Sequence, residues 1–388
     1  MARKMVCILS FSTIVQDARV LRQIEYLSSH YDITVVGHGP APAGVKYIEV
    51  PAFTTVSKLL AVVWLLLGKL APRAYEAWYW STRRHRAAYQ AMMATKPDAI
   101  HANDWNALPV AVRVAEKTGA RVVFDAHEYA PLQFGNRRLR VFLYTPAIRY
   151  MLGKYTRRAD AAMTVCAPIA ERYRDEFGLS MMVVMNAPAL SGEKPQERKI
   201  NPEQIRLIHH GGALRDRNLG LMIEAIAQAG KRFHLDFMLL PTDPAYLDEL
   251  KRLAEERAPG RVAFVDPVPP AQIVQTLQKY DIGFGVIDAT NYNYLMALPN
   301  KLFDFVAAGL AVVTGPSPAM VALIEEYDFG VASPTFDPRD IAGTLNSLTV
   351  ERIAEMQKAA REAAKVLNAD TEMAKVVDLY ARLLGEVY

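Results

Sequence analysis

Side chains of the types used in catalysis follow two apolar, strand-like runs in the first half of the 388-residue chain. Asp125, His127 and Glu128 end one of these runs, and Asn103 and Asp104 end the run before it. Because the carboxyl ends of parallel strands form the ligand crevice of an open α/β sheet, we expect these side chains at a binding site. Two plainer interpretations stay open: Asp125 caps a solvated loop at the strand end, and Asn103 or Asp104 caps the next helix.

Two glycines and two arginines stand after a strand-like run in the second half. They are Gly211, Gly212, Arg215 and Arg217, and a helical stretch follows them. Glycines let backbone amides approach a ligand closely, a helix N-terminus favours an anion, and guanidinium groups suit a diphosphate. The pattern indicates a diphosphate site, and the alternative is a tight strand-to-helix turn with solvated arginines.

A third group lies at the start of a later helix. Pro299 favours a helix start, Asn300 and Lys301 stand in the first turn, and Asp304 follows one turn later on the same face. Such a helix can place an ammonium group on a phosphate and a carboxylate on ribose hydroxyls. A cation in the first turn opposes the helix dipole, so a purely structural role explains Lys301 poorly.

The elements that must position these groups alternate between short apolar runs and amphipathic stretches, which is typical of parallel sheets with helices on both faces. In the first half we expect strands at 5–10, 33–37, 99–101, 121–125 and 161–165. We expect the first-half helices at 17–29, 56–95, 107–117 and 139–158. In the second half we expect strands at 205–209, 234–240, 262–264, 282–286 and 311–314. The helices expected there are 219–229, 245–257, 271–278, 300–308 and 319–327, followed by two without a strand partner at 350–369 and 372–387.

The predicted fold class is therefore α/β, with two Rossmann-like, doubly wound parallel-sheet domains facing a central cleft. The expected domains are 1–188 and 205–368, joined by a polar linker at 189–204. A C-terminal helix at 369–388 is expected to pack back on the first domain.

The composition and the motifs that are missing exclude several classes of protein. With 51% hydrophobic and 22% charged residues, the chain is neither collagen-like nor disordered. Its two cysteines, Cys7 and Cys166, cannot build a disulfide framework or a thiolate metal cage, which favours a reducing, cytoplasmic compartment. We expect no signal peptide, and no apolar run reaches the roughly 18 to 20 residues of a membrane-spanning helix. The sequence has no GxGxxG turn after the first strand and no Walker A loop, so neither a nicotinamide site nor a P-loop site is expected. It also has no GxSxG elbow and no HExxH helix, so the corresponding hydrolase and zinc sites are not expected.

In the order and spacing of these motifs, the chain resembles GT-B-fold glycosyltransferases of the retaining family-four type, a group with many members in bacterial polysaccharide biosynthesis. The resemblance covers nearly all of the chain. It is carried by residues 17–22, 31–36 and 125–128 in the first half and by residues 211–217, 299–304 and 308–309 in the second.

The resemblance implies that the C-terminal domain binds a nucleotide-diphosphate sugar, with UDP favoured, and that the N-terminal domain binds a saccharide or lipid-linked acceptor. The implied catalytic residues are His127 near the transferred sugar, and Arg217 and Lys301 on the diphosphate. The implied donor-binding residues are Gly211, Gly212, Arg215, Arg217, Asn300, Lys301 and Asp304. The candidates for acceptor binding or for a general base are Asp17, Arg19, Asn103, Asp104, Asp125 and Glu128.

The sequence departs from this family at two positions. Met296 stands eight residues before Asp304, where the first acid of the family's E-x7-E element is expected, and Ala213 stands where the first arginine of the phosphate pair is expected. The resemblance implies retention of configuration, with the leaving phosphate deprotonating the acceptor, whereas an inverting enzyme would need Asp17 or Glu128 as base. Preorganised cations can stabilise the leaving diphosphate, so no metal and no cofactor besides the nucleotide-sugar co-substrate are expected.

Charge is divided unequally along the chain. Residues 1–190 contain 24 Lys and Arg against 14 Asp and Glu, and the remainder contains 21 against 27, so the net charges are +10 and −6. In the first half an apolar run at 57–70 precedes aromatic residues and arginines, a pattern typical of an interfacial helix on an anionic membrane. The expected membrane contacts, on the inner face of the cell membrane, are Trp64, Lys69, Arg83, Arg84 and Arg86. The alternative is that the run packs on the sheet and the arginines are solvated.

Two other functions stay open on the same architecture. One is a sugar-nucleotide epimerase or hydrolase, and the other is a non-catalytic sugar-nucleotide-binding partner of another transferase. No nucleic acid partner is expected.

Overall fold

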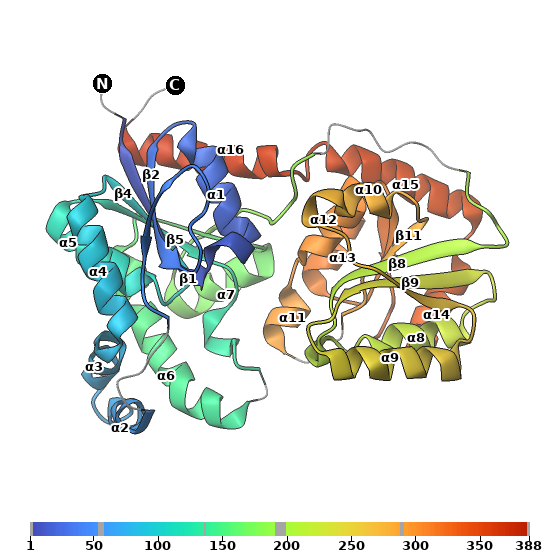
Figure 1. The fold of residues 1–388 in the computed structure, drawn as a ribbon, viewed down its shortest axis with the longest axis horizontal. Helices are drawn as coiled ribbons and strands as arrows, with labels where there is room; N and C mark the ends of the chain where they lie inside the picture. Colours follow the sequence, from blue (N-terminus) through green and yellow to red (C-terminus); the bar gives the residue numbers. More distant parts are fainter. Residues whose placement is uncertain (1–2, 53–57, 136, 191–198, 288–290, 386–388) are drawn as a thin grey trace. The chain divides into compact units, whose positions relative to one another are not determined.

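The computed structural model describes residues 3–52, 58–135, 137–190, 199–287 and 291–385. The chain divides into two compact units (Figure 1). Unit 1 comprises Met1–Met185 and Met373–Tyr388, and unit 2 comprises Asn186–Glu372. Each unit is built on one parallel sheet with helices between its strands, which confirms the predicted fold class. Of the expected linker at 189–204, residues 191–198 lie outside the described residues.

Among the described residues of unit 1, seven parallel strands form a sheet in the order β3-β2-β1-β4-β5-β6-β7. Their bounds are β1 Met5–Thr13, β2 Asp32–His38, β3 Lys46–Glu49, β4 Ala99–Asn103, β5 Arg121–Ala126, β6 Ala161–Thr164 and β7 Met182–Val183. Helices cover both faces of this sheet, and Val6, Ile8 and Leu9 of β1 are fully buried as a result.

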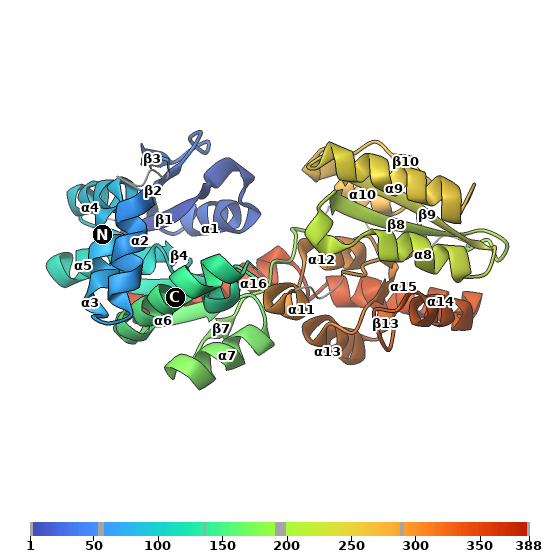
Figure 2. The same cartoon turned by 90° about the horizontal axis from the view of Figure 1, so that it is seen from below.

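The helices of unit 1 include the last helix of the chain. Their bounds are α1 Ala18–Ser28, α2 Lys58–Gly68, α3 Arg73–Ser81, α4 Arg83–Thr95, α5 Leu108–Thr118, α6 Arg138–Tyr155, α7 Ala167–Phe177 and α16 Ala369–Leu384. Helices α1 and α4 lie on opposite sides of β1 and β2 (Figure 2). Met373, Val376 and Tyr380 of α16 are buried in the hydrophobic core of unit 1. The prediction that the C-terminal helix packs back on the first half of the chain is confirmed.

The single helix expected at 56–95 is wrong, because the described part of this segment forms the three helices α2, α3 and α4. Pro72, which has no N–H group to continue a helix, stands directly before α3. Thr82 has extended backbone, with φ −71° and ψ 123°, and separates α3 from α4. Residues 53–57, which include the expected start, lie outside the described residues.

Unit 2 contains six parallel strands among its described residues, in the order β10-β9-β8-β11-β12-β13. The strand bounds are β8 Ile205–Gly212, β9 Phe233–Leu240, β10 Val262–Val265, β11 Ile282–Phe284, β12 Ala311–Thr314 and β13 Gly330–Ala332. The helix bounds are α8 Gly220–Gln228, α9 Pro244–Arg257, α10 Ile273–Leu277, α11 Tyr292–Met296, α12 Asn300–Ala307, α13 Pro318–Tyr327, α14 Pro338–Ser347 and α15 Val350–Ala364.

The two last helices of the chain belong to different units. Ile353 and Met356 of α15 lie in the core of unit 2, whereas α16 closes the core of unit 1. The expected helix at 350–369 therefore ends earlier, at Ala364, before the chain leaves unit 2. Within the described ranges, no helix is long and apolar enough to cross a membrane.

Candidate functional site

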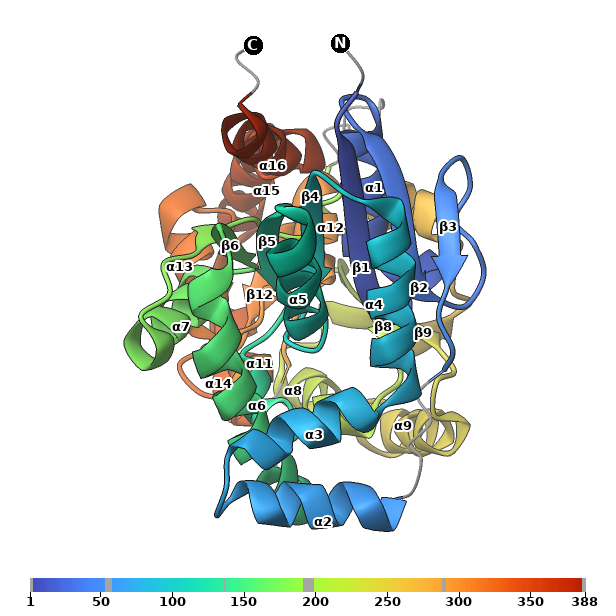
Figure 3. The same ribbon diagram turned by 90° about the vertical axis from the view of Figure 1, so that its left-hand side faces the viewer.

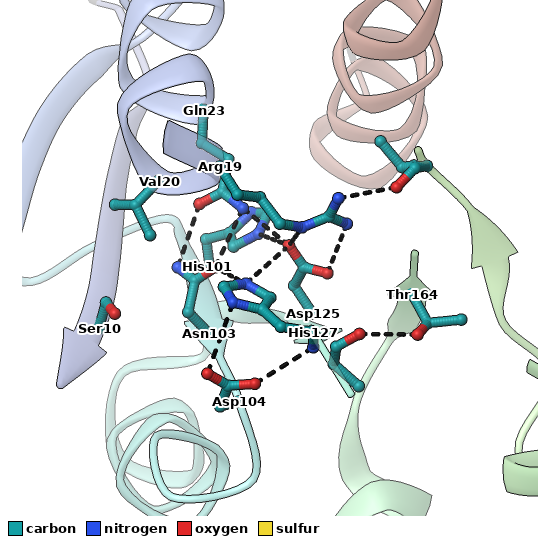
Figure 4. A network of polar contacts seen from close by, with 12 residues as sticks. Ser10, Arg19, Val20, Gln23, His101, Asn103, Asp104, Asp125, His127 and Thr164 are labelled. Carbon is teal, nitrogen blue, oxygen red and sulfur yellow. Dashed lines mark hydrogen bonds and ion pairs between the residues drawn. The ribbon is translucent and has the colours of Figure 1, made fainter. Parts of the chain in front are cut away.

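The polar residues expected at strand ends lie together in unit 1 (Figure 4). Asn103 is the last residue of β4, Asp125 and Ala126 end the neighbouring β5, and His127 follows directly. The order of strands changes direction between β1 and β4, because the chain passes from β1 to β2 on one side and later returns to β4 on the other. Open α/β sheets bind ligands at such a switch point, so the topology of the sheet places these side chains at a candidate site.

Asp125 is the buried centre of this group. Its side chain is 0% exposed, and its oxygens accept hydrogen bonds of 2.7 Å from Nε and Nη2 of Arg19 and from Nε2 of Gln23. Nε2 of His101 and Nε2 of His127 each lie 3.5 Å from Oδ2 of Asp125. Burial raises the pKa of this carboxyl, but the charge of Arg19 and the two imidazole groups outweigh burial and hold the pKa well below its ordinary value. Asp125 is therefore an anchor that is ionised at neutral pH.

Two of the other candidate residues are buried with Asp125. Arg19 is 6% exposed and also donates to the carbonyl oxygen of Val184 at 2.7 Å. Asn103 is fully buried and exchanges hydrogen bonds of 3.0 and 3.1 Å with Gln23. Because Asp125 is buried and hydrogen-bonded, the solvated-loop interpretation of this residue is wrong.

His127 is the member of the group that reaches solvent, with 20% of its side chain exposed. Its Nε2 donates to Oδ1 of Asn103 at 3.0 Å, and its Nδ1 lies 3.5 Å from Oδ2 of Asp104. Burial lowers the pKa of the imidazole, but the charges of Asp104 and Asp125 raise it to about 9. At neutral pH His127 is therefore a cation with a donor on each nitrogen, suited to hydroxyl or phosphate oxygens and unsuited to accept a proton.

Two further carboxyl groups, Asp104 and Glu128, adjoin the imidazole in sequence or in space. Asp104 has left-handed backbone with φ 65°, and α5 has Ala107 as its N-cap with no side-chain hydrogen bond, so the helix-capping interpretation is wrong. Burial raises the pKa of Glu128 to about 7, and the charge of Asp104 adds to the effect. A carboxyl that titrates near neutral pH suits a general base. Asp17, the other candidate base, caps α1 by accepting the N–H of Val20 at 3.2 Å.

The sequence patterns assigned no role to three members of this network: Gln23, His101 and Tyr380. Gln23 follows Arg19 by four residues on α1, so the two side chains lie on one face of the helix, and this spacing was a usable signal. Nδ1 of His101 lies 2.9 Å from the hydroxyl of Tyr380, and the two rings stack with centroids 6.0 Å apart. The 279 residues between them leave no local signal for this contact.

The paired glycines of unit 2 end β8, where the second sheet changes direction between β8 and β11. Gly211 has φ +129°, and a Cβ there would lie 3.4 Å from Nη1 of Arg217 and 3.5 Å from Nζ of Lys301. A Cβ at Gly212 would lie 2.9 Å from Oγ1 of Thr242. Both basic side chains therefore lie close to the backbone of Gly211. Two basic side chains beside half-buried glycine backbone at a switch point suit a diphosphate.

Lys301 lies in the first turn of α12 and is 5% exposed. Its Nζ lies 2.8 Å from Nε2 of His209, whose Nδ1 lies 2.7 Å from the carbonyl oxygen of Phe284. Because a carbonyl oxygen only accepts, Nδ1 of His209 carries the proton and Nε2 accepts from Lys301. Burial lowers the pKa of Lys301 well below its ordinary value, and the charge of Arg217 lowers it further. His209 is thus a member of the cluster that the sequence patterns did not indicate.

Asp304 lies on α12 three residues after Lys301, about one helical turn away, as the spacing predicts. Its side chain is 15% exposed, with Oδ2 3.4 Å from Nε2 of His210. Burial lowers the pKa of His210 to about 3, and the charges of Lys301 and Arg217 add to the effect, so this imidazole is neutral at neutral pH. Asn300 is exposed at the first residue of α12.

Arg215 does not join the cluster. Its Nη1 and Nη2 donate to the two carboxylate oxygens of Glu249 at 2.7 Å, and its Nε donates to Asp243 at 3.1 Å. Its guanidinium carbon also lies 5.1 Å from the centre of the Tyr246 ring. These contacts hold Arg215 on α9 and on Asp243, the N-cap of that helix. In the described part of the chain, no three His, Cys, Asp or Glu side chains are grouped so that they could hold a metal ion.

Comparison with known families decides the class of protein. Residues 16–187 match Glycosyltransferase Family 4, a range that contains the whole polar network of unit 1 except Tyr380. Residues 16–187 are therefore similar to the family-four glycosyltransferases, and the chain as a whole has the GT-B fold. The curated proteins include no sequence match to it.

Solved structures of glycosyltransferases share the fold over nearly the whole chain. HepE (Alr3699) from Anabaena, in complex with UDP, is 15% identical with a TM-score of 0.71, and the match covers 98% of this chain and 100% of HepE. Sucrose-phosphate synthase from Thermosynechococcus elongatus is 14% identical with a TM-score of 0.73, covering 99% of this chain and 100% of the synthase. WaaG, a glycosyltransferase involved in lipopolysaccharide biosynthesis, is 14% identical with a TM-score of 0.64, covering 96% of this chain and 99% of WaaG.

Proposed function

We propose that this glycosyltransferase moves a sugar from a UDP-sugar to a saccharide or lipid-linked acceptor, with retention, in cell-surface polysaccharide biosynthesis. The observation that carries the proposal is the pair of cations, Arg217 and Lys301, held against Gly211 at the switch point of unit 2. UDP is the favoured nucleotide because the similar HepE forms complexes with UDP and with UDP-glucose. The pathway is suggested by WaaG, which acts in lipopolysaccharide biosynthesis.

In the proposed reaction, the bond between the anomeric carbon and the diphosphate oxygen breaks, and its electron pair leaves with the diphosphate. Arg217 and Lys301 stabilise the negative charge that grows on this leaving group, and such preorganised charge is usually the largest catalytic contribution. Because two cations already supply positive charge, the proposed reaction uses no metal ion. The acceptor oxygen bonds to the anomeric carbon through an oxocarbenium-like state, and its proton passes to an oxygen of the leaving phosphate.

Acceptor binding is assigned to unit 1. His127 is the group proposed to contact the transferred sugar, because it is a cation at neutral pH and its side chain reaches solvent, so it can attract sugar hydroxyl oxygens. Asp104 and Glu128 are the proposed acceptor ligands. If the reaction inverts configuration, Glu128 is the candidate base, since its pKa of about 7 allows proton transfer near neutral pH.

The proposed place of action is the cytoplasmic face of the cell membrane, where a lipid-linked acceptor is available. Both cysteines of the chain, Cys7 and Cys166, are buried free thiols. Unpaired thiols are typical of proteins in reducing compartments, which supports the cytoplasmic side.

Thermal unfolding with added nucleotides tests the donor assignment. Wild type, Lys301→Ala and the matched control Arg215→Ala are melted with UDP, GDP, CMP and their common sugar conjugates. A ligand that binds only the folded chain stabilises it by RT ln(1 + [L]/Kd), about 2.7 kcal/mol at a hundredfold excess over Kd. We expect UDP and UDP-sugars to stabilise wild type and Arg215→Ala but to lose most of this effect in Lys301→Ala. Equal stabilisation of Lys301→Ala, or none by any nucleotide, contradicts the donor site.

Turnover with the bound UDP-sugar separates the transferase from the two other functions. A transferase releases UDP in proportion to added acceptor, and the anomeric proton of the product reports its configuration by NMR. An epimerase or hydrolase converts the UDP-sugar without an acceptor. A non-catalytic partner binds the UDP-sugar but does not turn it over, whether or not an acceptor is added.

A further inference from the structure

Helix α2 is apolar on all sides, but only a narrow strip of it is buried. Between Leu59 and Gly68 it has no charged residue. Ala61 and Leu65 face the protein, and the ring of Tyr75 from α3 lies against the position where Gly68 lacks a side chain. The remaining leucines and valines are half-buried or exposed. An apolar helix buried along one strip needs another partner for the rest of its surface.

The exposed side chains of α2 continue onto the start of α6. Leu70, just after α2, is 88% exposed, and Leu139 and Phe142 on α6 are 71% and 56% exposed. Nζ of Lys69 lies 2.9 Å from the centre of the Phe142 ring, which joins the two segments into one surface. Figure 3 shows α2 along one end of unit 1, next to α3. We call this set the α2–α6 surface; it consists of Leu59, Leu60, Val63, Leu66, Leu67, Leu70, Leu139 and Phe142.

The charged residues around the α2–α6 surface are all of one sign. Segments 58–75 and 137–149 contain seven Lys and Arg and no Asp or Glu. All six of these cations whose burial is described are exposed: Lys69, Arg73, Arg137, Arg138, Arg140 and Arg149. Arg149 forms an ion pair of 2.7 Å with Glu176 of α7. Glu76, the next acidic residue, is already bound to Lys154 at 2.6 Å. The α2–α6 surface therefore combines exposed apolar side chains with positive charge. Segments 58–75 and 137–149 contain no carboxylate that would neutralise this charge.

We propose that the α2–α6 surface docks on an anionic lipid bilayer. Its leucines and Phe142 would lie at the boundary between the headgroups and the acyl chains, and the arginines around the surface would contact lipid phosphates. Apolar side chains with a cationic rim are what such a bilayer binds. A second copy of the chain fits less well, because a symmetric dimer through this surface would bring like charges together. The inference deepens the proposed function by naming the surface that would approach a lipid-linked acceptor, but the docking itself requires no donor.

This surface differs from the membrane contacts expected from the sequence. Lys69 belongs to it, and Trp64 is half-buried on α2. The guanidinium group of Arg84 lies 4.6 Å from the centre of the Phe11 ring and is half-buried, so Arg84 is not a membrane contact. Arg83 and Arg86 are exposed, but they lie on α4, beyond the intervening helix α3.

Sedimentation with sucrose-loaded vesicles tests the proposal on the full chain. The vesicles are phosphatidylcholine alone or phosphatidylcholine with phosphatidylglycerol. The test variants are Leu66→Ser/Leu67→Ser/Leu70→Ser and Arg138→Gln/Arg140→Gln. We expect wild type to bind the anionic vesicles only, less tightly at high salt, and each lost arginine to weaken binding about fivefold. The three leucine changes are expected to abolish sedimentation, because they remove the groups that insert.

The matched control changes the same residue types at exposed positions elsewhere. Leu240 is 54% exposed in unit 2, and the side chain of Arg174 is 62% exposed on α7, so Leu240→Ser/Arg174→Gln should sediment like wild type. Melting with and without UDP shows that every variant folds and keeps its nucleotide response, so failure of the donor site and failure of docking are distinguishable. No binding by wild type, or equal binding by the leucine variant, overturns the proposal. A wild-type dimer that the leucine variant converts to monomer assigns the surface to a second copy and also overturns it.

Discussion

We expect Lys301 to take up a proton when a UDP-sugar binds to unit 2. Without ligand, burial and the charge of Arg217 hold the pKa of Lys301 well below its ordinary value. Nη1 of Arg217 and Nζ of Lys301 lie 3.4 and 3.5 Å from the same point beside Gly211. They are therefore no more than about 7 Å apart, and two full charges would repel by about 2 kcal/mol or more at an effective dielectric constant of about 20. One phosphate charge at about 4 Å attracts an ammonium by about 4 kcal/mol under the same conditions, so a diphosphate favours the charged form.

Calorimetry of binding in two buffers with different enthalpies of ionisation measures this proton. The difference in heat between the buffers gives the number of protons taken up. A UDP-sugar is used rather than UDP, because its diphosphate has no ionisation near neutral pH. Since the complex holds more protons than the free chain, affinity falls as pH rises, by up to tenfold for each pH unit between the pKa values of Lys301 in the free and bound states.

Lys301→Arg is the matched variant, because a guanidinium group stays protonated across this pH range. It should bind the UDP-sugar with the same heat in both buffers and lose the pH dependence. Heats for wild type that do not depend on the buffer would refute the reasoning. Equal proton uptake by Lys301→Arg would place the proton on another group and refute the role of Lys301.

Three more outcomes follow from the two clusters. Asp125→Asn leaves the Arg19 charge buried without its partner, so urea unfolding should show a loss of about 3 to 5 kcal/mol; no loss would mean that Asp125 anchors nothing. In wild type, the stability that Asp125 contributes is present above the ordinary pKa of an aspartate and is lost as pH falls through its depressed pKa in the folded chain. His127→Ala should leave UDP affinity unchanged while transfer falls about 100- to 1000-fold, and transfer by wild type should decline above a pH of about 9, where the imidazole loses its proton. Arg217→Ala should weaken UDP binding at least about tenfold, whereas Arg215→Ala should change it less than about twofold; isothermal titration that gives the reverse order would disprove the assignment.

The two sheets could be predicted because their signals are local. The run from Met5 to Leu9 is apolar without interruption, as a strand covered on both faces must be, and helices of suitable length separate such runs. One helix was predicted at 56–95 because most residues around Pro72 and Thr82 favour a helix. The breaks before α3 and before α4 depend on how these helices pack, which the local sequence does not show. The short edge strands β3 and β7 have few residues and weak patterns, so their pairing is decided by neighbours that are distant in sequence.

The grouping of candidate residues could be predicted where local structure fixes the direction of a side chain. Arg217 follows a strand-to-helix turn and Lys301 lies in a first helical turn, and both lie beside Gly211. The pairing of Arg215 with Glu249 could not be predicted, because Glu249 is 34 residues away on another helix and no local pattern shows that the pair forms. The burial of Asp125 could not be predicted either, since its partner Arg19 is 106 residues earlier.

A ribosome completes unit 1 last. Residues 1–185 emerge before unit 2, but Tyr31 and His101 have ring contacts with Tyr380, which is made after unit 2. At about 5 to 20 residues per second, synthesis of the intervening unit 2 takes roughly 10 to 40 s. Unit 2 is continuous from Asn186 to Glu372, so it can finish its sheet while the nascent first unit still has an open core. A product that terminates before α16 would therefore contain the complete cluster of Gly211, Arg217 and Lys301 but leave the core of unit 1 open. Under the proposed function, it would bind the donor without passing on the sugar.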